Sequence, residues 1–232
     1  MSNDKIILLF GVDDDLFKSC FGKDEEWLPS SLKSLPEECS NLDLQAALVQ
    51  PGLHCVVCMD VECFDRLQDY YDNGGFVAFF GIYGEFNVPN HLNSQWKFSA
   101  YTNHEYELTS VAKHYIGDAI SKQQYTKSNL VSAPEGDRIM IPKIGSFEDY
   151  LSENFDIDME DIYDTNDPDT ANEVKAARKQ WPRIVDELSN QSPLVMHRND
   201  QGGKVAYLGF VNHDGNIPKI VRALLNGIKV IN

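Results

Sequence analysis

The sequence predicts an α/β fold with a mostly parallel central sheet, and three short apolar runs support that prediction. They span residues 5–10, 54–59 and 76–80, and each is followed by a glycine or an aspartate. Unbroken apolar runs of this length are typical of strands buried on both faces of a parallel sheet. A helical pattern separates the second run from the third. Two strands with a helix between them make a βαβ unit, which closes right-handed.

Between the first two of these strands, the sequence predicts further elements. Apolar side chains recur over residues 16–38 at mostly helical spacing, with interruptions at Gly22 and Pro29, which predicts two short helices. The apolar run at 44–49 predicts another strand, and the Pro-Gly pair that follows it predicts a turn.

A helix and a strand are predicted in succession over residues 61–80. Phe64, Leu67 and Tyr71 share one helical face, and an Asn-Gly-Gly sequence follows them. Glycine ends a helix readily because it accepts the left-handed conformation of a C-cap. We therefore expect the helix over 61–72, with the strand at 76–80 directly after it.

A tight turn is predicted where that strand ends. Gly81 and Gly84 bracket two residues, which is the shape of a nucleophile elbow. The bracketed residues are Ile82 and Tyr83, where serine or cysteine would be the nucleophile. The pattern therefore predicts the turn without predicting a nucleophile.

The middle of the chain is less regular. Residues 96–102 alternate between polar and apolar side chains and predict a strand, whereas 108–116 fit a strand or a helix equally well. A short strand is predicted within 137–142, and a helix over 171–188 with Pro182 near a break.

One segment differs from the rest in charge. Residues 147–173 carry eleven aspartates and glutamates and no lysine or arginine. We interpret 145–172 as an acidic peripheral insertion in a single domain that spans residues 1–232.

The last third of the chain predicts a hairpin and a helix. Apolar strands at 193–197 and 204–211 flank a turn that contains two glycines. A final helix follows, with Asn216 or Asp214 as its cap and Pro218 in its first turn, where a missing N–H has no cost.

Composition limits the classes of partner. The formal net charge is −16, which excludes nucleic acid and anionic membranes as expected partners, because phosphates are bound by lysine and arginine. The apolar runs are too short to span a bilayer, and the start of the chain is too polar for a signal peptide. The five cysteines are an odd number and predict reduced thiols in a cytoplasmic protein. The oligomeric state stays open.

Two segments resemble a known family. They are the stretch from Asp60 to Gly81 and the stretch from Gly203 to Ile228, in which a strand leads through a loop with a histidine into a helix ending in Asn-Gly-Ile. Both resemble ThuA-like (trehalose-utilisation) proteins of the class I glutamine amidotransferase-like superfamily. The match covers about a third of the chain. It implies a flavodoxin-like three-layer α/β/α sandwich.

The resemblance also implies a catalytic arrangement that this chain keeps only in part. Amidotransferases of the superfamily use a cysteine at the elbow, which a histidine activates. Ile82 and Tyr83 occupy the elbow here, so cysteine-dependent glutamine hydrolysis is not expected. His213 and Asp214 follow the last strand, where the family's histidine would lie.

Polar side chains follow each predicted parallel strand. In an open α/β sheet the carboxyl ends of the strands line the crevice where ligands bind. We expect ligand-binding roles for Asp13, Asp14, Asp15, Asp60, Tyr83 and Asn212, and catalytic roles for His213, Glu85 and Asp214. The carboxylates would suit a divalent cation, although no cofactor is required. The alternative is that these aspartates cap the helices that follow.

The pair Cys55 and Cys58 has the spacing of a thiol pair. Residues three apart on a strand point to opposite faces, which predicts two buried thiols that neither form a disulfide nor share a metal.

Two functions remain open from the sequence. The first is a ThuA-like protein without the cysteine nucleophile, which binds a small polar ligand, such as one related to a carbohydrate, at the carboxyl ends of the strands. It would carry out hydrolase-type acid–base chemistry, with His213 as base, or have no activity. The alternative is a non-catalytic protein-interaction module that uses its acidic surface.

Overall fold

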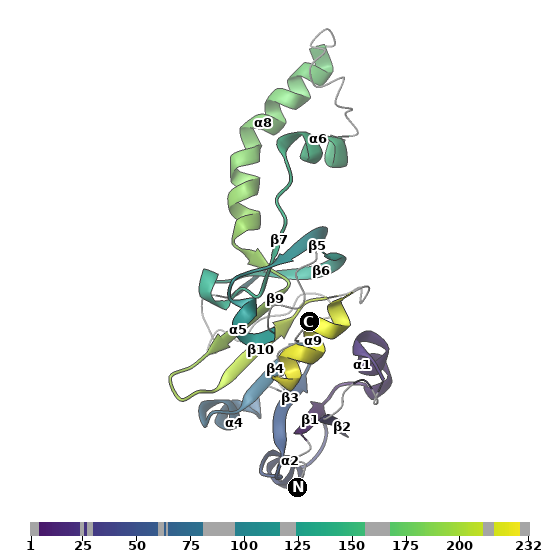
Figure 1. The fold of residues 1–232 in the computed structure, drawn as a ribbon, viewed down its shortest axis with the longest axis vertical. Helices are drawn as coiled ribbons and strands as arrows, with labels where there is room; N and C mark the ends of the chain where they lie inside the picture. Colours follow the sequence, from purple (N-terminus) through teal and green to yellow (C-terminus); the bar gives the residue numbers. More distant parts are fainter. Residues whose placement is uncertain are drawn as a thin grey trace.

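The computed structural model describes most of the 232-residue chain. The described residues are 5–23, 26, 30–59, 63, 65–80, 96–116, 124–155, 168–210 and 216–227. Figure 1 shows a lower body built around a long sheet, a smaller sheet above it, and two helices that extend from one end of the molecule.

A six-stranded sheet forms the centre of the body, in the order β2-β1-β3-β4-β10-β9 (Figure 1). All neighbouring pairs are parallel except β10 and β9, which are antiparallel. This confirms the prediction of an α/β fold with a mostly parallel central sheet. The strands are β1 (Lys5–Phe10), β2 (Ser30–Leu35), β3 (Leu53–Cys58), β4 (Phe76–Phe80), β9 (Leu194–Arg198) and β10 (Lys204–Leu208).

The strand predicted at 44–49 is wrong. Residues 44–49 lie mostly in helix α2 (Asn41–Leu48), which begins where the Ser40 hydroxyl accepts a hydrogen bond from the Asp43 amide at 3.2 Å. The strand is instead β2, inside the segment predicted as two helices. Because β2 is an edge strand in which only Ser30 is buried, it lacks the apolar run of a central strand.

Helices cover both faces of the central sheet. One face packs against α1 (Asp14–Phe21), α5 (Ala112–Ile116) and α9 (Ile217–Asn226), through side chains such as Ile7 and Leu9. The other face packs against α2 and α4 (Gln68–Asp72), through side chains such as Leu8 and Phe10. Alternate residues of each strand therefore enter different cores.

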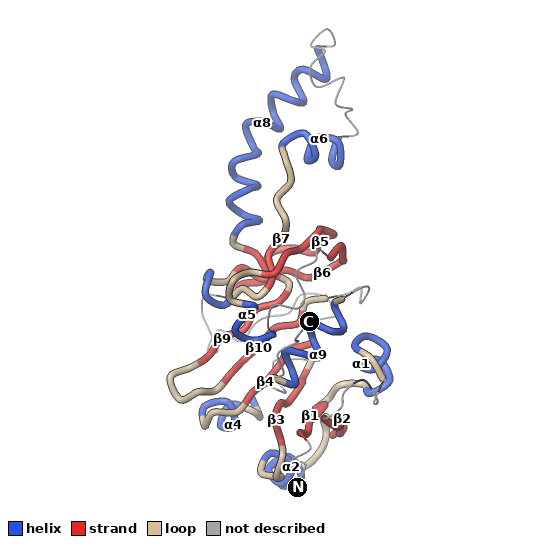
Figure 2. The backbone as a smooth tube through the Cα atoms, in the orientation of Figure 1, coloured by secondary structure: helices blue, strands red, loops and turns tan. Residues whose placement is uncertain are grey.

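A second, antiparallel sheet lies against the carboxyl-terminal part of β10. Its order is β7-β5-β6-β8, with β5 (Lys97–Leu108), β6 (Gln124–Ser132), β7 (Met140–Pro142) and β8 (Gln191–Ser192); a short 3-10 helix, η2 (Glu135–Asp137), precedes β7. Figure 2 shows the strands of both sheets in red. The two sheets meet at Gly209, whose carbonyl accepts a hydrogen bond from the Asn129 amide at 2.7 Å.

The ambiguous stretch at 108–116 has two parts in the structure. Residue 108 ends β5, which is longer than the predicted strand at 96–102, and Ala112–Ile116 form α5. The predicted hairpin is confirmed by β9 and β10, which pair from Leu194↔Leu208 to Arg198↔Lys204. The final helix is confirmed as α9, with its proline in the first turn.

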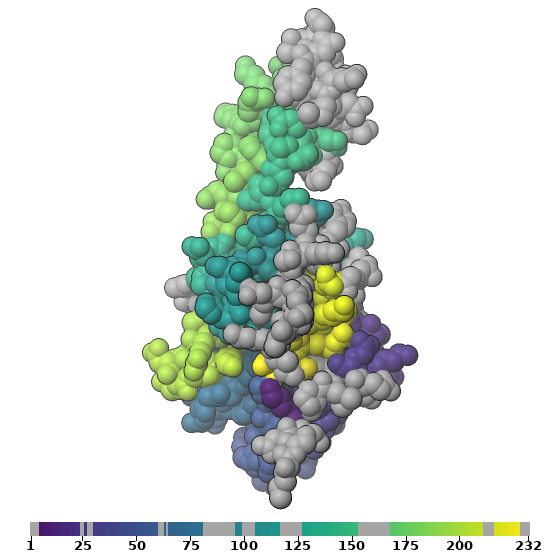
Figure 3. Space-filling view, viewed as in Figure 1, coloured from purple at the N-terminus to yellow at the C-terminus, as the bar shows by residue number. Residues whose placement is uncertain are grey.

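Two helices, α6 (Phe147–Phe155) and α8 (Pro168–Ser189), make up what we call the arm. Figures 1 and 3 show both helices extending from the end of the molecule that carries the second sheet. At 22 residues, α8 is about 33 Å long. Its position confirms the helix predicted at 171–188, but Pro182 lies inside a continuous helix and not at a break.

Candidate functional site

The three aspartates that follow β1 stand at the start of α1. The Asp13 carboxylate accepts a hydrogen bond from the Leu16 amide at 2.7 Å and is the N-cap of the helix. Asp14 forms an ion pair with Lys18 at 2.7 Å, one helical turn further on. Asp15 is exposed. Two of the three carboxylates thus have local partners, as the capping alternative predicts.

The remaining predicted site residues lie outside the described part of the chain. They are Asp60, Tyr83, Glu85, Asn212, His213 and Asp214. Their roles stay predictions. Within the described residues, no group of three or more histidines, cysteines, aspartates or glutamates could hold a metal ion.

The described carboxyl edge of the sheet is occupied by the side chain of Arg66. Its guanidinium donates hydrogen bonds to the carbonyl oxygens of Glu37 at 2.5 Å and Cys39 at 2.7 Å. It also lies over the Phe10 ring, 5.0 Å from the ring centroid. Phe10 ends β1 and Glu37 lies two residues after the end of β2, so the Arg66 side chain covers this corner of the sheet.

Aromatic rings fill the other face at the same edge. Phe17 and Phe21 of α1 meet Phe80, the last residue of β4, with ring centroids 5.6 and 5.0 Å apart and edge-to-face geometry. All three side chains are fully buried. These rings anchor α1 to the sheet, and they leave its described carboxyl edge apolar on this face.

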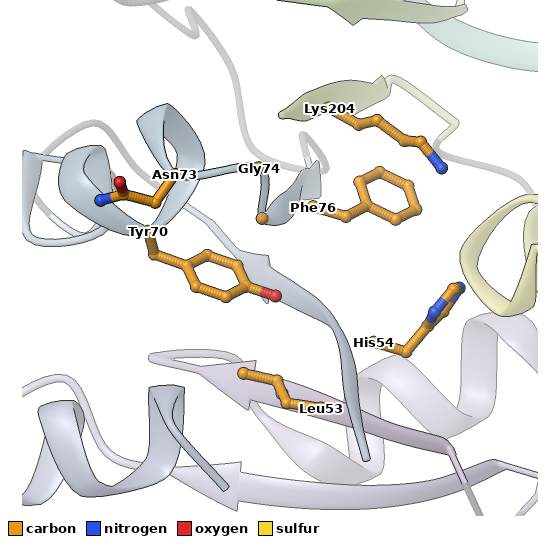
Figure 4. Close-up of a pocket in the computed structure, with 8 residues that line it drawn as sticks. Leu53, His54, Tyr70, Asn73, Gly74, Phe76 and Lys204 are labelled. Atoms are coloured by element: carbon orange, nitrogen blue, oxygen red, sulfur yellow. The ribbon is translucent and has the colours of Figure 1, made fainter. Parts of the chain in front are cut away.

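A cavity opens at the opposite, amino-terminal edge, between the starts of β3 and β4 (Figure 4). These strands pair only from Val56 and Val77 onward, so the residues before them diverge. The cavity volume is about 410 Å³, a size typical of small-molecule sites. It is lined by Leu53, His54, Tyr70, Asn73, Gly74, Gly75, Phe76 and Lys204.

His54 owes its position to an irregularity in β3. Ile6 pairs with Leu53 and Ile7 with Cys55, so His54 is an extra residue with no partner on β1. Such a bulge redirects a side chain. The imidazole lies edge-to-face with Phe76, at a centroid distance of 6.3 Å. Its buried Nε2 atom has no hydrogen-bond partner among the described residues.

The charges around His54 are positive. Burial, followed by the charges of Lys5 and Lys204, lowers the pKa of His54 to about 4. Lys5 donates a hydrogen bond to the Asn226 carbonyl at 2.5 Å, at the carboxyl end of α9. Lys204 lies over the Phe76 ring, 5.8 Å from its centroid. The imidazole is therefore neutral at pH 7.

Tyr70 and Cys55 complete the surroundings of the cavity. Burial raises the pKa of Tyr70 to about 12, and a backbone hydrogen bond with Phe76 opposes that shift. Burial also raises the pKa of the fully buried Cys55 thiol. Cys55 and Cys58 enter the cores on opposite faces of the sheet, and neither forms a disulfide, which confirms the predicted buried thiols.

Sequence reasoning missed the amino-terminal edge, because it looked for ligands only where parallel strands end. Lys5 and Lys204 each begin a predicted strand, and His54 begins the third, so a basic residue at three strand starts was a signal available in the sequence. It also missed a contact between Asp137 and His197, whose Nδ1 lies 3.2 Å from the carboxylate. The same carboxylate accepts a hydrogen bond from Trp96 at 2.8 Å, which links β9 to the second sheet.

The two helices of the arm pack through aromatic side chains. Trp181 of α8 packs against Phe147 and Tyr150 of α6, with ring centroids 5.9 and 5.1 Å away. In the described arm only Leu151 and Ala177 are fully buried. The inner face of α8 is therefore only thinly covered.

Together these features define an α/β protein with a mostly parallel central sheet, a second antiparallel sheet and a helical arm. None of the described helices is long and apolar enough to cross a membrane. No family model matches the chain, and no curated protein sequence matches it.

A solved structure shares the fold. It is titled "mmIFT52 N-terminal domain", has a TM-score of 0.51 to this chain and is 12% identical in sequence. The alignment covers 94% of this chain and 93% of that one. The similarity therefore extends over nearly the full length of both chains, and at this identity it concerns the fold alone.

Proposed function

We propose that this chain is a non-catalytic module that binds a protein partner through its arm. The observation that carries the proposal is the thin cover on α8. Val174, Trp181, Ile184 and Leu188 of its inner face all stay partly exposed. An amphipathic helix of this length is stabilised by burial of its apolar face, and α6 covers only part of that face. A partner would cover the rest.

The charge of residues 147–173 favours a basic partner, whereas the rest of α8 also carries Lys175, Arg178, Lys179 and Arg183. Glu148 and Asp149 lie in the first turn of α6, and Asp169 lies in the first turn of α8. The segment 147–173 as a whole has eleven acidic and no basic side chains. Complementary charge speeds association and selects among partners. This segment is the acidic one that the sequence assigns to an interaction module, and its residues 156–167 lie outside the described part of the chain.

The carboxyl edge supports the same proposal. Where residues are described, Arg66 and the Phe17–Phe21–Phe80 rings fill it on both faces, and Asp13 and Asp14 hold local partners. If the chain is an interaction module, we expect side chains to fill the crevice at this edge.

Site-specific cross-linking tests the proposal. A photoreactive benzoylphenylalanine would replace Trp181, or Leu42 as a control, in cells that naturally express the chain. Leu42 lies on α2 and is 82% exposed, so its reactivity reports random encounters. We expect one discrete protein adduct from position 181 that is absent at position 42. The purified partner should bind Trp181→Ala at least tenfold more weakly than wild type, and Leu42→Ala normally. Identical adducts from both positions would count against the arm.

A second function is favoured by the strand order. The parallel strands run β2-β1-β3-β4-β10, which is the 2-1-3-4-5 order of flavodoxin-like folds. This order supports a flavodoxin-like three-layer sandwich and the ThuA-like, glutamine amidotransferase-like relationship. In such folds a ligand binds where the order reverses, here between β1 and β3, and Asp13 lies shortly after the end of β1.

A thermal-shift screen distinguishes the second function from the first. Divalent cations, glutamine, sugars and sugar phosphates would be tested on wild type and on His213→Ala. A ligand at about 100 times its Kd adds roughly 2.7 kcal/mol to the stability of the native state. A shift that His213→Ala abolishes would support a small polar ligand at the carboxyl edge, with His213 as base and Glu85 or Asp214 as its partner. The absence of any shift would leave the interaction module as the proposal.

A further inference from the structure

We propose that the cavity between the starts of β3 and β4 binds a small organic anion with a carboxylate or phosphate-ester group and an apolar body. This site lies at the amino-terminal edge of the sheet, opposite the edge predicted to bind a polar ligand, and it is separate from the arm. It therefore stands independently of both functions proposed above.

The charge at the cavity is positive. Among the described residues, Lys204 is the only charged side chain that lines the cavity, and it is a cation. Lys5 lies nearby, because its Nζ and the His54 imidazole both approach Gly227. The protein as a whole has a net charge of −16, so a surface free of acidic lining is unusual here. Cations that line a concave site raise the local concentration of anions.

The fold explains why these cations gather. Lys5 and Lys204 are the first residues of β1 and β10, and His54 is the second residue of β3. Parallel strands place their starts along one edge of the sheet. The bulge at His54 turns its ring toward Phe76, on the face that carries α9 (Figure 4).

The walls suit an apolar body. Leu53 and the Tyr70 ring line the cavity, below and to the left of Phe76 in Figure 4, and both are partly exposed. Phe76 is buried beneath the Lys204 ammonium and forms the inner wall. Small-molecule sites typically combine mostly apolar walls with a few placed polar groups. Lys204 supplies the charge that orients the ligand, and the neutral imidazole adds polar contact without a competing charge.

Titration calorimetry with four probes tests the proposal. The probes are benzoate, phenyl phosphate, inorganic phosphate and the neutral benzyl alcohol. We expect at least one of the two aromatic anions to bind more tightly than inorganic phosphate, and benzyl alcohol not to bind. Benzoate and phenyl phosphate together show whether a carboxylate or a phosphate ester fits better. Binding of benzyl alcohol as tightly as benzoate, or no binding of either aromatic anion, would overturn the proposal.

A charge-removing variant locates the site. Lys204→Met keeps most of the length of the side chain and removes its charge, and Lys97→Met removes an exposed lysine from β5 as a control. We expect about tenfold or greater weakening of the aromatic anion with Lys204→Met, because a charge-assisted hydrogen bond is lost. Equal weakening by both variants would indicate a general charge effect and overturn the proposal.

Nuclear magnetic resonance of the wild type keeps the test independent of whether Lys204→Met folds. The bound anion should shift the amide signals of Gly74, Gly75 and Lys204. It should also raise the pKa of His54 from its value of about 4, because it offsets the charges of Lys5 and Lys204. Signals that move only elsewhere, with no change at His54, would overturn the proposal.

Discussion

At the scale of single residues, Arg66 connects more of the body than any other described cation. Its guanidinium holds the carbonyls of Glu37 and Cys39, which lie between β2 and α2, and it stacks on Phe10 at the end of β1. The planar fork of arginine can bridge two carbonyls and stack at the same time, whereas an ammonium cannot. Arg66 thereby fixes the connection between β2 and α2.

We predict that Arg66→Lys lowers the free energy of unfolding by about 2 kcal/mol, because two charge-assisted hydrogen bonds to carbonyls are lost or weakened. Urea unfolding followed by circular dichroism measures this change. The matched control is Arg183→Lys, whose arginine pairs with Glu187 on the exposed side of α8. That change should cost less than about 0.5 kcal/mol. Equal effects from the two variants would contradict the role of Arg66.

His54 gives the protein a specific pH dependence. Its pKa is about 4 in the folded state and about 6.5 when unfolded, so between these values the unfolded chain binds the additional proton. The contribution of His54 is fully present above pH 6.5 and is lost as the pH falls toward 4. After allowance for partial exposure, we expect a loss of about 2 kcal/mol over that range.

A comparison of His54→Gln with wild type separates the pH dependence caused by His54 from the pH dependence caused by aspartate and glutamate side chains. The variant should lose less stability than wild type between pH 6.5 and pH 4, measured by urea unfolding at several pH values. His114→Gln, at an exposed position of α5, serves as the control and should follow wild type. If His54→Gln and wild type have parallel curves, the buried imidazole does not titrate as described.

For single residues, the sequence predicted local roles better than it predicted which charged side chains lie nearby. The cap at Asp13 was foreseen as the alternative to a ligand role, and the opposed burial of Cys55 and Cys58 follows from strand alternation. The cationic surroundings of His54 were not foreseen, because Lys5 and Lys204 are almost 200 residues apart in the chain. Only the parallel pairing of the strands brings them to one edge.

At the scale of elements, the join between the two sheets depends on Gly209. Its amide donates to the Pro193 carbonyl at 2.8 Å, and its carbonyl accepts from Asn129. A Cβ atom at this position would overlap the Asn129 carbonyl oxygen. Only glycine therefore allows the end of β10 to meet β6 so closely.

We predict that Gly209→Ala destabilises the fold by roughly 2–3 kcal/mol, through overpacking against the backbone of β6. Gly136→Ala is the matched control, because a Cβ atom there would have no neighbour within 4 Å. The control should stay within about 0.5 kcal/mol of wild type in urea unfolding. A cost at position 136 equal to that at 209 would contradict the steric explanation.

Pro182 weakens α8 from within. Proline has no amide hydrogen, so the helix loses one backbone bond at this position. We predict that Pro182→Ala slows hydrogen exchange of the amides on either side of residue 182, since an interior proline costs about 3 kcal/mol relative to alanine. Gln180→Ala, at a neighbouring exposed position, should change little. Unchanged exchange in Pro182→Ala would contradict this prediction.

The buried strands and the final helix were predicted correctly, whereas the helix predicted over 61–72 is present among the described residues only in part, with a turn at 66–67 and α4 at Gln68–Asp72. The errors at β2 and α2 have a common cause. Residues 76–80 and the hairpin strands are apolar because both faces of the sheet are covered there. The edge strand β2 and the helix α2 were misassigned because each packs on one side only, which weakens the pattern that periodicity relies on. A single proline also predicted a break, whereas Pro182 lies inside the continuous helix α8.

At the scale of the whole molecule, the net charge of −16 sets the response to salt. Like charges repel more strongly in the compact state, and added salt screens them. We predict that the Tm rises as NaCl increases from about 20 mM to about 200 mM, over which screening lengths fall below about 10 Å. Calorimetry measures the change, with sucrose at equal osmolality as the control. A falling Tm would contradict net repulsion.

The central claim is that the arm, and not a catalytic crevice, carries the function. The most direct test is the affinity of the protein cross-linked at position 181, measured by calorimetry for wild type, Trp181→Ala and Leu42→Ala. We expect at least tenfold weaker binding for Trp181→Ala alone. The far-ultraviolet circular dichroism of the three proteins should be the same. Equal affinities for the three proteins would contradict it.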